Sequence, residues 1–149
     1  MPASPGGLRF AKLRAEERSF IVVNSMDSVG RESKHVAVAV CSPTSGLVGD
    51  RLAIITHRGR GRFELRGFAP NGAPAEPDAT LAACAAVAVH RRYGYREVSL
   101  RDAGHDHDAR ITGDSVRVRT TSRATGGPAG EIESHIHVAY LFDGEFRNW

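Results

Sequence analysis

Residues 79–93 read ATLAACAAVAVHRRY and stand between Asp78 and Gly94. Alanine is the strongest helix former, so this stretch predicts an α-helix of about four turns. Asp78 suits the N-cap of that helix, and Gly94 suits the position after its last turn. From Ala79 to Val89 no face is charged, and a helix that is apolar all round must be surrounded by protein. Its small side chains would let a sheet wrap closely around it.

Strand-like segments lie on both sides of this helix. Before it, apolar runs predict buried strands at 20–23, 36–41, 52–56 and 63–68. After it, strands are expected at 97–101, 109–111, 115–120 and 132–142, separated by polar loops such as 121–130. Strands, one helix and more strands favour an α+β fold over an alternating βαβ fold. We therefore predict one α+β domain over 8–149, a mixed or antiparallel sheet wrapped around the helix, after a flexible tail at 1–7.

Composition limits the class of protein. The 149 residues suffice for one domain, and 41% hydrophobic with 25% charged residues is typical of a globular chain. No apolar run reaches the roughly 18 residues that span a bilayer, and the N-terminus has no signal-like stretch, so we expect no membrane partner and a cytoplasmic location. Cys41 and Cys84 have no CxxC spacing, which favours buried reduced thiols over a disulfide.

Two polar clusters could suggest other partners. The basic run HRGRGR at 57–62 lies between two predicted strands and is typical of a glycine-rich hairpin turn, so we expect no nucleic-acid partner. The run HDHD at 105–108 follows Gly104 and is interpreted as a polar turn between strands. It has no third ligand at a recognisable spacing, so we expect no metal. No nucleotide-binding loop or Schiff-base lysine is evident, and we expect no cofactor.

Several segments resemble diaminopimelate epimerases when they are taken in order. FAKL at 10–13 with FIVV at 20–23 is similar to that family's F-x-K-M opening and F-V-V-I strand. GDRLAII at 49–55 resembles G-A-D-G-L-L-L-I, FELRGFAPNG at 63–72 resembles F-x-M-R-I-F-N-x-D-G, and HVAYLFD at 137–143 resembles P-H-x-V-x-F-V-x-D. Phenazine-biosynthesis isomerases share this fold, and their F-T-P and H-A-T-L-A-A motifs are similar to 68–70 and 79–83. The resemblance covers 8–143 and matches one half of such a protein.

This resemblance implies a site and an assembly. Family members carry two such halves in one chain, with the substrate in the cleft between the N-termini of two central helices. Backbone N–H groups and the positive end of the dipole at a helix N-terminus suit a substrate carboxylate. Two thiols, one from each half, move the α-proton. A single half would need a second copy to close the cleft, so the resemblance implies a homodimer.

The residues that carry the family's chemistry are replaced here. The catalytic cysteine aligns with Asp78, or with Glu76 if the loop gap is placed differently. The glycine and asparagine after that cysteine become Ala79 and Thr80. Three further asparagines align with Arg18, Ala69 and His135, and Asn71 lies in the matching 63–72 segment. We therefore exclude diaminopimelate epimerisation and expect substrate binding by Arg18, Ala79, Thr80 and Asn71.

Three ionisable side chains are the candidates for catalysis. Asp78 is either a simple helix cap or a general acid/base that faces its copy across a dimer cleft. A capping carboxylate is stabilised as the anion, so Glu76, which has no cap to make, is the better base if it points inward. His135 shares one side of its strand with His137, and it could act as an acid or base if that side faces the cleft.

Two functions follow. The first is a cofactor-independent isomerase, tautomerase or cyclase of a biosynthetic pathway, which moves protons on a small anionic substrate. The second is a degenerate relative that binds a ligand or a partner without chemistry. The missing cysteine favours the second. The ionisable residues Arg18, Asp78 and His135 at the matching positions favour the first, because decay more often leaves small neutral residues.

Overall fold

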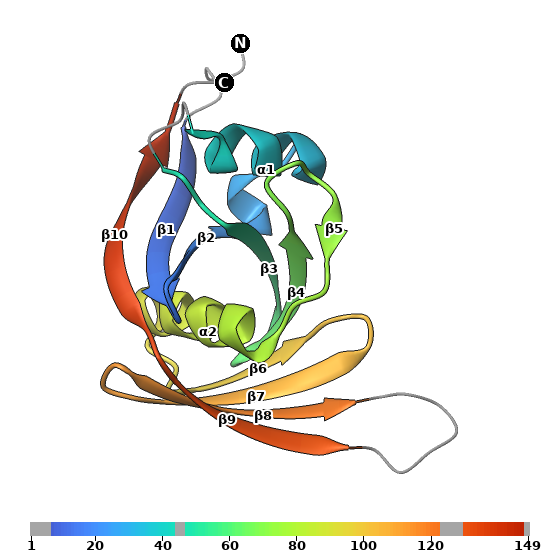
Figure 1. Ribbon diagram of the computed structural model, residues 1–149, viewed down its shortest axis with the longest axis vertical. Helices are drawn as coiled ribbons and strands as arrows, with labels where there is room; N and C mark the ends of the chain where they lie inside the picture. Colours follow the sequence, from blue (N-terminus) through green and yellow to red (C-terminus); the bar gives the residue numbers. More distant parts are fainter. Residues whose placement is uncertain (1–6, 44–46, 123–129, 148–149) are drawn as a thin grey trace.

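The computed structural model describes residues 7–43, 47–122 and 130–147. The chain forms a strongly curled sheet with two helices, and Figure 1 shows how they are arranged. The strand order is β10-β1-β2-β3-β4-β6-β7-β8-β9, and the short β5 pairs with β4. Because β2–β3 and β4–β6 run parallel while the other neighbours run antiparallel, the sheet is mixed, and the predicted α+β class is confirmed. The elements are β1 Leu8–Ala15, β2 Arg18–Asn24, the 3-10 helix η1 Ser25–Asp27, α1 Ser33–Cys41, β3 Arg51–Gly59, β4 Arg62–Phe68, β5 Pro74–Ala75, α2 Ala79–Tyr93, β6 Glu97–Arg101, β7 His105–Thr112, β8 Ser115–Ser122, β9 Glu131–His137 and β10 Ala139–Phe146.

The alanine-rich helix α2 lies inside the curl of the sheet. Asp78 begins it, because its Oδ1 accepts a hydrogen bond of 2.8 Å from the Leu81 amide. Gly94 ends it in the left-handed conformation, and the Gly94 amide donates to the His90 carbonyl. From Thr80 to Val89 the helix is almost wholly buried, and it contacts strands β1–β4 and β6–β9. In Figure 1 this helix lies between the β1–β4 part of the sheet and the β6–β9 part.

The cap at Gly94 gives a first prediction. Gly94 has φ of 84°, and a Cβ built there meets no atom within 4 Å, so only backbone strain opposes a side chain. We expect Gly94→Ala to lower the free energy of unfolding by about 1 kcal/mol, measured by urea denaturation. Gly104→Ala is the matched control, because its Cβ also meets nothing and its φ is not positive. Equal effects at the two sites would contradict this explanation.

The segment 36–41 was expected to be a strand, and this was wrong. It forms the last six of the nine residues of α1. The buried residues of α1 are Val36, Ala37, Val40 and Cys41, whose spacing places them on one face of a helix, while Val38 is exposed. The alternation of valine and alanine hid this pattern, because an apolar run of six residues fits a buried strand and a buried helix equally well.

The two helices cover opposite faces of the β1–β4 part of the sheet. Phe20 and Val22 of β2 belong to the core around α2, whereas Ile21 and Val23 belong to a second core under α1. A strand that is buried on both faces reads as a continuous apolar run, which explains FIVV at this position. Neither α1 nor α2 is long and apolar enough to cross a membrane.

Two further boundaries differ from expectation. Residues 105–108 are not a turn: they begin β7, with His107 facing the core and Asp108 facing outward. The strand expected at 132–142 is divided into β9 and β10, which join through the buried Val138. The chain crosses there from one end of the strand order to the other. The tail expected at 1–7 and the loop expected at 121–130 lie largely outside the described residues, and Thr121 and Ser122 extend β8.

Candidate functional site

The N-terminal end of α2 brings together two of the residues that the sequence singled out. Arg18 opens β2 and Asp78 precedes α2, sixty residues later in the chain. The Arg18 Nη2 donates a hydrogen bond of 3.0 Å to Asp78 Oδ2, while Asp78 Oδ1 caps the helix. The guanidinium also lies over the Phe20 ring, 5.0 Å from its centroid. Both charged side chains stay open to solvent, with 36% and 53% of their surface exposed.

The first turn of α2 leaves donors open beside this ion pair. Asp78 occupies the Leu81 amide with its side chain and the Ala82 amide with its carbonyl. The described part of the chain shows no acceptor for the amides of Ala79 and Thr80. The first orphan N–H groups of a helix form an anion-binding end together with its dipole. Arg18, Ala79 and Thr80 therefore share a donor-rich corner beside the Asp78 carboxylate.

The other predicted site residues lie differently. Glu76 is exposed in the loop two residues before Asp78. Asn71 stands in the turn between β4 and β5, where its Oδ1 accepts the Ala73 amide, and its neighbour Gly72 packs on Lys34 of α1. His135 is 68% exposed and lies on the outward face of β9, because Ile136 next to it faces the core. The structure therefore brings neither Asn71 nor His135 to the end of α2.

The cysteines carry no reactive thiol. Both are free and buried, as the sequence suggested. Burial, and next the charge of Asp78, raises the pKa of the Cys84 thiol above its ordinary value. Burial raises the pKa of Cys41 to about 11, with a further contribution from Asp50. Both groups are therefore thiols at neutral pH, and no thiolate replaces the missing catalytic cysteine at these positions.

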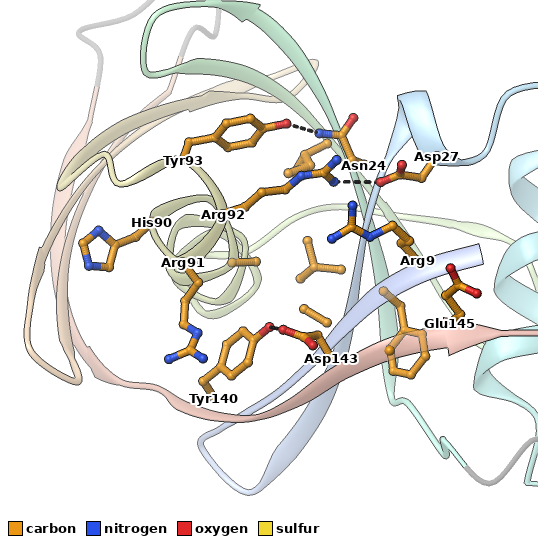
Figure 2. A pocket seen from close by; sticks show the side chains of 16 residues that line it. Arg9, Asn24, Asp27, His90, Arg91, Arg92, Tyr93, Tyr140, Asp143 and Glu145 are labelled. Atoms are coloured by element: carbon orange, nitrogen blue, oxygen red, sulfur yellow. Dashed lines mark hydrogen bonds and ion pairs between the residues drawn. The ribbon is translucent and has the colours of Figure 1, made fainter. Parts of the chain in front are cut away.

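A cavity of about 730 Å³ opens at the opposite, C-terminal end of α2 (Figure 2). Its floor is apolar and comes from three strands and the helix: Ala11, Val22, Ile55 and Ala88. Its rim is polar and includes Arg9, Asn24, Arg91, Arg92, Tyr93 and Tyr140. Asn24 Nδ2 donates to the Tyr93 hydroxyl over 2.9 Å, which joins the end of β2 to the end of the helix.

Sequence reasoning missed this cavity. One signal was present: Arg9 falls in step with Ala11, Leu13 and Ala15, whose side chains face α2, so the period of two places a charge on the inner face of β1. The other signal was weaker. Arg91 and Arg92 stand in the last turn of the helix, where basic residues are common for the sake of the helix dipole alone.

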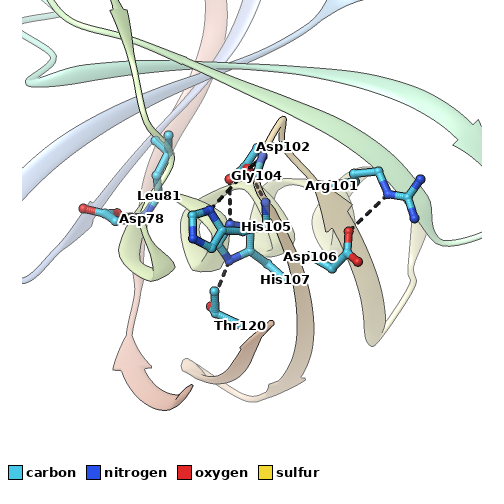
Figure 3. A network of polar contacts seen from close by, with 9 residues as sticks. All are labelled: Asp78, Leu81, Arg101, Asp102, Gly104, His105, Asp106, His107 and Thr120. Atoms are coloured by element: carbon cyan, nitrogen blue, oxygen red, sulfur yellow. Dashed lines mark hydrogen bonds and ion pairs between the residues drawn. The ribbon is translucent and has the colours of Figure 1, made fainter. Parts of the chain in front are cut away.

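A buried polar network was also missed, because its residues had been interpreted as a turn. Figure 3 shows Asp102 and Thr120 on opposite sides of the His107 ring. Asp102 Oδ2 lies 2.9 Å from His107 Nε2, and Thr120 Oγ1 lies 2.9 Å from His107 Nδ1. Because a carboxylate only accepts, Nε2 donates to Asp102, and in the neutral ring Nδ1 accepts from the Thr120 hydroxyl.

The negative charge of Asp102 is stabilised by several hydrogen bonds. Burial alone would raise its pKa, but hydrogen bonds from His107 and from the amides of Gly104 and His105 outweigh burial, and the pKa of Asp102 falls below its ordinary value. His107 is only 1% exposed, so this is a buried, fully paired carboxylate–imidazole contact. Among the described residues, no group of three His, Cys, Asp or Glu side chains is arranged to hold a metal ion.

Comparison with solved structures identifies the fold. An Enterococcus faecalis protein of the phenazine biosynthesis PhzF family matches with a TM-score of 0.55 and 12% identity, over 76% of this chain and 44% of that one. The Bacillus anthracis PhzF-family protein matches with a TM-score of 0.54 and 10% identity, over 76% and 40% of the two chains. Methylitaconate-delta-isomerase gives a TM-score of 0.49 at 11% identity, over 79% and 35%.

These matches rest on structure alone. No family model matches the chain, and no curated protein matches it. The chain spans less than half the length of each of the three solved structures. At such low sequence identity the comparison shows the fold and does not show the activity. The chain therefore adopts, in a single domain, the diaminopimelate-epimerase-like fold that it shares with PhzF-family proteins, as its sequence predicted.

Proposed function

We propose that this chain is a cofactor-independent isomerase-type enzyme that moves protons on a small carboxylic acid at the N-terminal end of α2. One observation carries the proposal: Arg18 and Asp78, from distant parts of the chain, meet at 3.0 Å beside two open helix amides. The fold shared with phenazine-biosynthesis proteins of the PhzF family supports a small-molecule enzyme of biosynthesis.

Substrate binding uses the donor-rich corner around Arg18, Ala79 and Thr80. A substrate carboxylate accepts hydrogen bonds from the amides of Ala79 and Thr80 and competes with Asp78 for the Arg18 guanidinium. Charge-assisted hydrogen bonds of this kind are about twice as strong as neutral ones. An Arg18 that turns to the substrate leaves Asp78 Oδ2 without its partner, so the same event binds the anion and frees an acceptor for a proton.

Proton transfer is assigned to carboxylates. Asp78 takes the substrate proton once Arg18 has moved, while its Oδ1 continues to cap the helix. Glu76 has no capping contact and is the second candidate for the base. His135 takes no part within one subunit, because its side chain lies on the outward face of β9.

A second copy of the chain completes the cleft in this proposal. Asp78 is half exposed, and Ile132 on the inward-facing row of β9 is 66% exposed beside Thr120. An uncovered isoleucine on the inner face of a sheet gains from burial against another protein surface. A symmetric dimer would cover both Asp78 and Ile132, and it would place two copies of Asp78 and Glu76 in one cleft.

Hydrogen exchange with solvent tests the proposed chemistry without a known substrate. The protein is incubated in D₂O with a panel of amino, hydroxy and unsaturated carboxylic acids, and carbon-bound deuterium is measured by mass spectrometry. We expect exchange in at least one acid, and we expect Asp78→Asn to lower the rate by about 10²–10⁴-fold, because Asn keeps the cap but accepts no proton. Glu76→Gln tests the second candidate, and Glu97→Gln, an exposed residue paired with Arg110, is the control.

A catalytically degenerate protein that binds a ligand or a partner is the second candidate function. Asp78 favours it, because both of its oxygens are already engaged, one by the helix and one by Arg18. Exchange that proceeds at the wild-type rate in Asp78→Asn and in Glu76→Gln would remove both carboxylates from the mechanism. No exchange with any acid would favour the binding function.

A further inference from the structure

The cavity at the C-terminal end of α2 has the features of a ligand site and lies at the other end of the helix from the proposed chemistry. Its volume of about 730 Å³ falls within the range of small-molecule pockets. Its floor of Ala11, Val22, Ile55 and Ala88 suits a carbon skeleton, and most of the other lining side chains are polar.

The charges on the rim are unevenly neutralised. The three carboxylates have partners: Asp27 accepts from Arg92 at 2.7 Å, Asp143 from the Tyr140 hydroxyl at 2.6 Å, and Glu145 from Arg147 at 2.6 Å. Neither Arg9 nor Arg91 forms an ion pair within the described part of the chain. Arg9 and Arg91 therefore have no carboxylate partner among the described residues, although Asp143, whose partner is a neutral phenol, keeps its negative charge at the cavity.

The remaining arginines are held in place from different elements. Arg91 of α2 lies over the Tyr140 ring, 4.0 Å from its centroid, which fixes its plane. Arg9 belongs to β1 and stands opposite Glu145 of β10. Figure 2 shows Arg9 and Arg91 on opposite sides of the apolar floor. A molecule with an acidic group at each end would give each of the two guanidinium groups a partner.

The C-terminal end of α2 can bind an anion only if cationic side chains are present there. The C-terminus of a helix carries partial negative charge and repels an anion by itself. Here the Gly94 amide covers the His90 carbonyl, and Arg91 and Arg92 stand in the last turn. The two arginines place positive charge at this end of the helix and oppose its partial negative charge. The pKa of Tyr140, raised to about 12 by burial and by Asp143, keeps that phenol neutral beside a bound anion.

We propose that this cavity binds a small dicarboxylate, with Arg9 and Arg91 each taking one carboxylate and the apolar floor taking the chain between them. Each guanidinium offers a bidentate pair of donors to its carboxylate. The site needs only one subunit and does not depend on the chemistry proposed at Asp78.

Calorimetric titration of the 149-residue chain with malonate, succinate, glutarate and adipate tests this site. We expect one chain length to bind best, at least tenfold tighter than its diamide and than the monocarboxylate of the same length. Arg9→Gln and Arg91→Gln should each weaken that binding by about tenfold or more. Arg117→Gln, an exposed arginine on the outer face of β8, should leave it unchanged.

Three results would overturn the site. If a diamide or a monocarboxylate binds as tightly as the diacid, the cavity does not recognise two carboxylates on one ligand. Unchanged affinity in Arg9→Gln or Arg91→Gln would show that this arginine does not bind the ligand. Circular dichroism checks that each variant is folded. Loss of binding in Arg18→Gln would indicate that the ligand binds at the N-terminal end of α2 instead. Unchanged binding in Arg18→Gln would show that the cavity is separate from the proposed active site, whatever the outcome of the exchange assay.

Discussion

Replacing His107 by alanine is expected to lower the free energy of unfolding by about 3–5 kcal/mol. His107 is fully buried, and its Nε2 donates to the buried carboxylate of Asp102 at 2.9 Å. Removal of His107 leaves a charge in the protein interior without its imidazole partner, and the amides of Gly104 and His105 continue to donate to it. The Thr120 hydroxyl also loses its imidazole acceptor. Both losses act on the same three-residue network.

Urea denaturation of His107→Ala measures this loss. Asp106→Ala is the control from the same strand, because Asp106 is partly exposed and its ion pair with the exposed Arg101 should contribute less than about 1 kcal/mol. A loss of less than 1 kcal/mol in His107→Ala would mean that water reaches Asp102 and replaces the imidazole.

Acid adds a second readout at the same residue. The pKa of Asp102 is lower in the folded chain than its ordinary value of 3.8, so the folded state holds the anion more tightly than the unfolded state does. The stability from this group is therefore present above pH 3.8 and is lost as the pH falls through the folded pKa. Without His107 the pKa of Asp102 rises, because burial is opposed by fewer donors. Acid unfolding of the variant should begin at a higher pH than that of the wild type.

Phe20→Ala should cost about 3–5 kcal/mol as well, by a different route. Phe20 is fully buried in the core around α2, and the small side chains of that helix leave no bulk that could move into the gap. The substitution would also remove the ring on which Arg18 lies. We therefore expect weaker binding of carboxylates at the N-terminal end of α2 in addition to the lost stability.

The matched control for Phe20 is Phe142→Ala. Phe142 lies on β10 with 44% of its surface exposed, and it meets Phe10 edge to face at a centroid distance of 5.9 Å. We expect its loss to cost no more than about 1.5 kcal/mol, the usual strength of an aromatic pair. Thermal unfolding of both variants gives the comparison. Equal costs would indicate that the core around α2 collapses into the space that Phe20 leaves.

Local signals predicted the fold best where two of them agreed. Around α2 the alanine content, the Asp78 cap and the glycine at position 94 all indicated one helix, and the structure has both caps. The strand at 115–120 was recognisable from its alternating apolar and polar residues, and β8 shows the same alternation in burial over these residues. The segment 36–41 failed because no cap accompanied its apolar run: Glu32 makes no side-chain hydrogen bond at the start of α1.

The candidate site was predictable only in part, because the sequence does not show how the strands pair. Alignment with the family placed Arg18 and Asp78 together, and the structure joins them. His135 was placed by the same alignment but faces outward, because the face of a strand depends on its register with β8. The network around His107 was hidden because polar residues in a strand resemble a turn. Only the pairing of β7 with β8 sets His107 opposite Thr120.

The pairing of β1 with β10 has a consequence for ancestry and for engineering. Leu8 lies opposite Phe146, so the first and last described strands end side by side at one edge of the domain (Figure 1). A second copy of the gene, fused in frame behind the first, would need only a short connector and would break no hydrogen bond of either sheet. Duplication followed by fusion is thus a route from one such domain to a chain of two tandem domains.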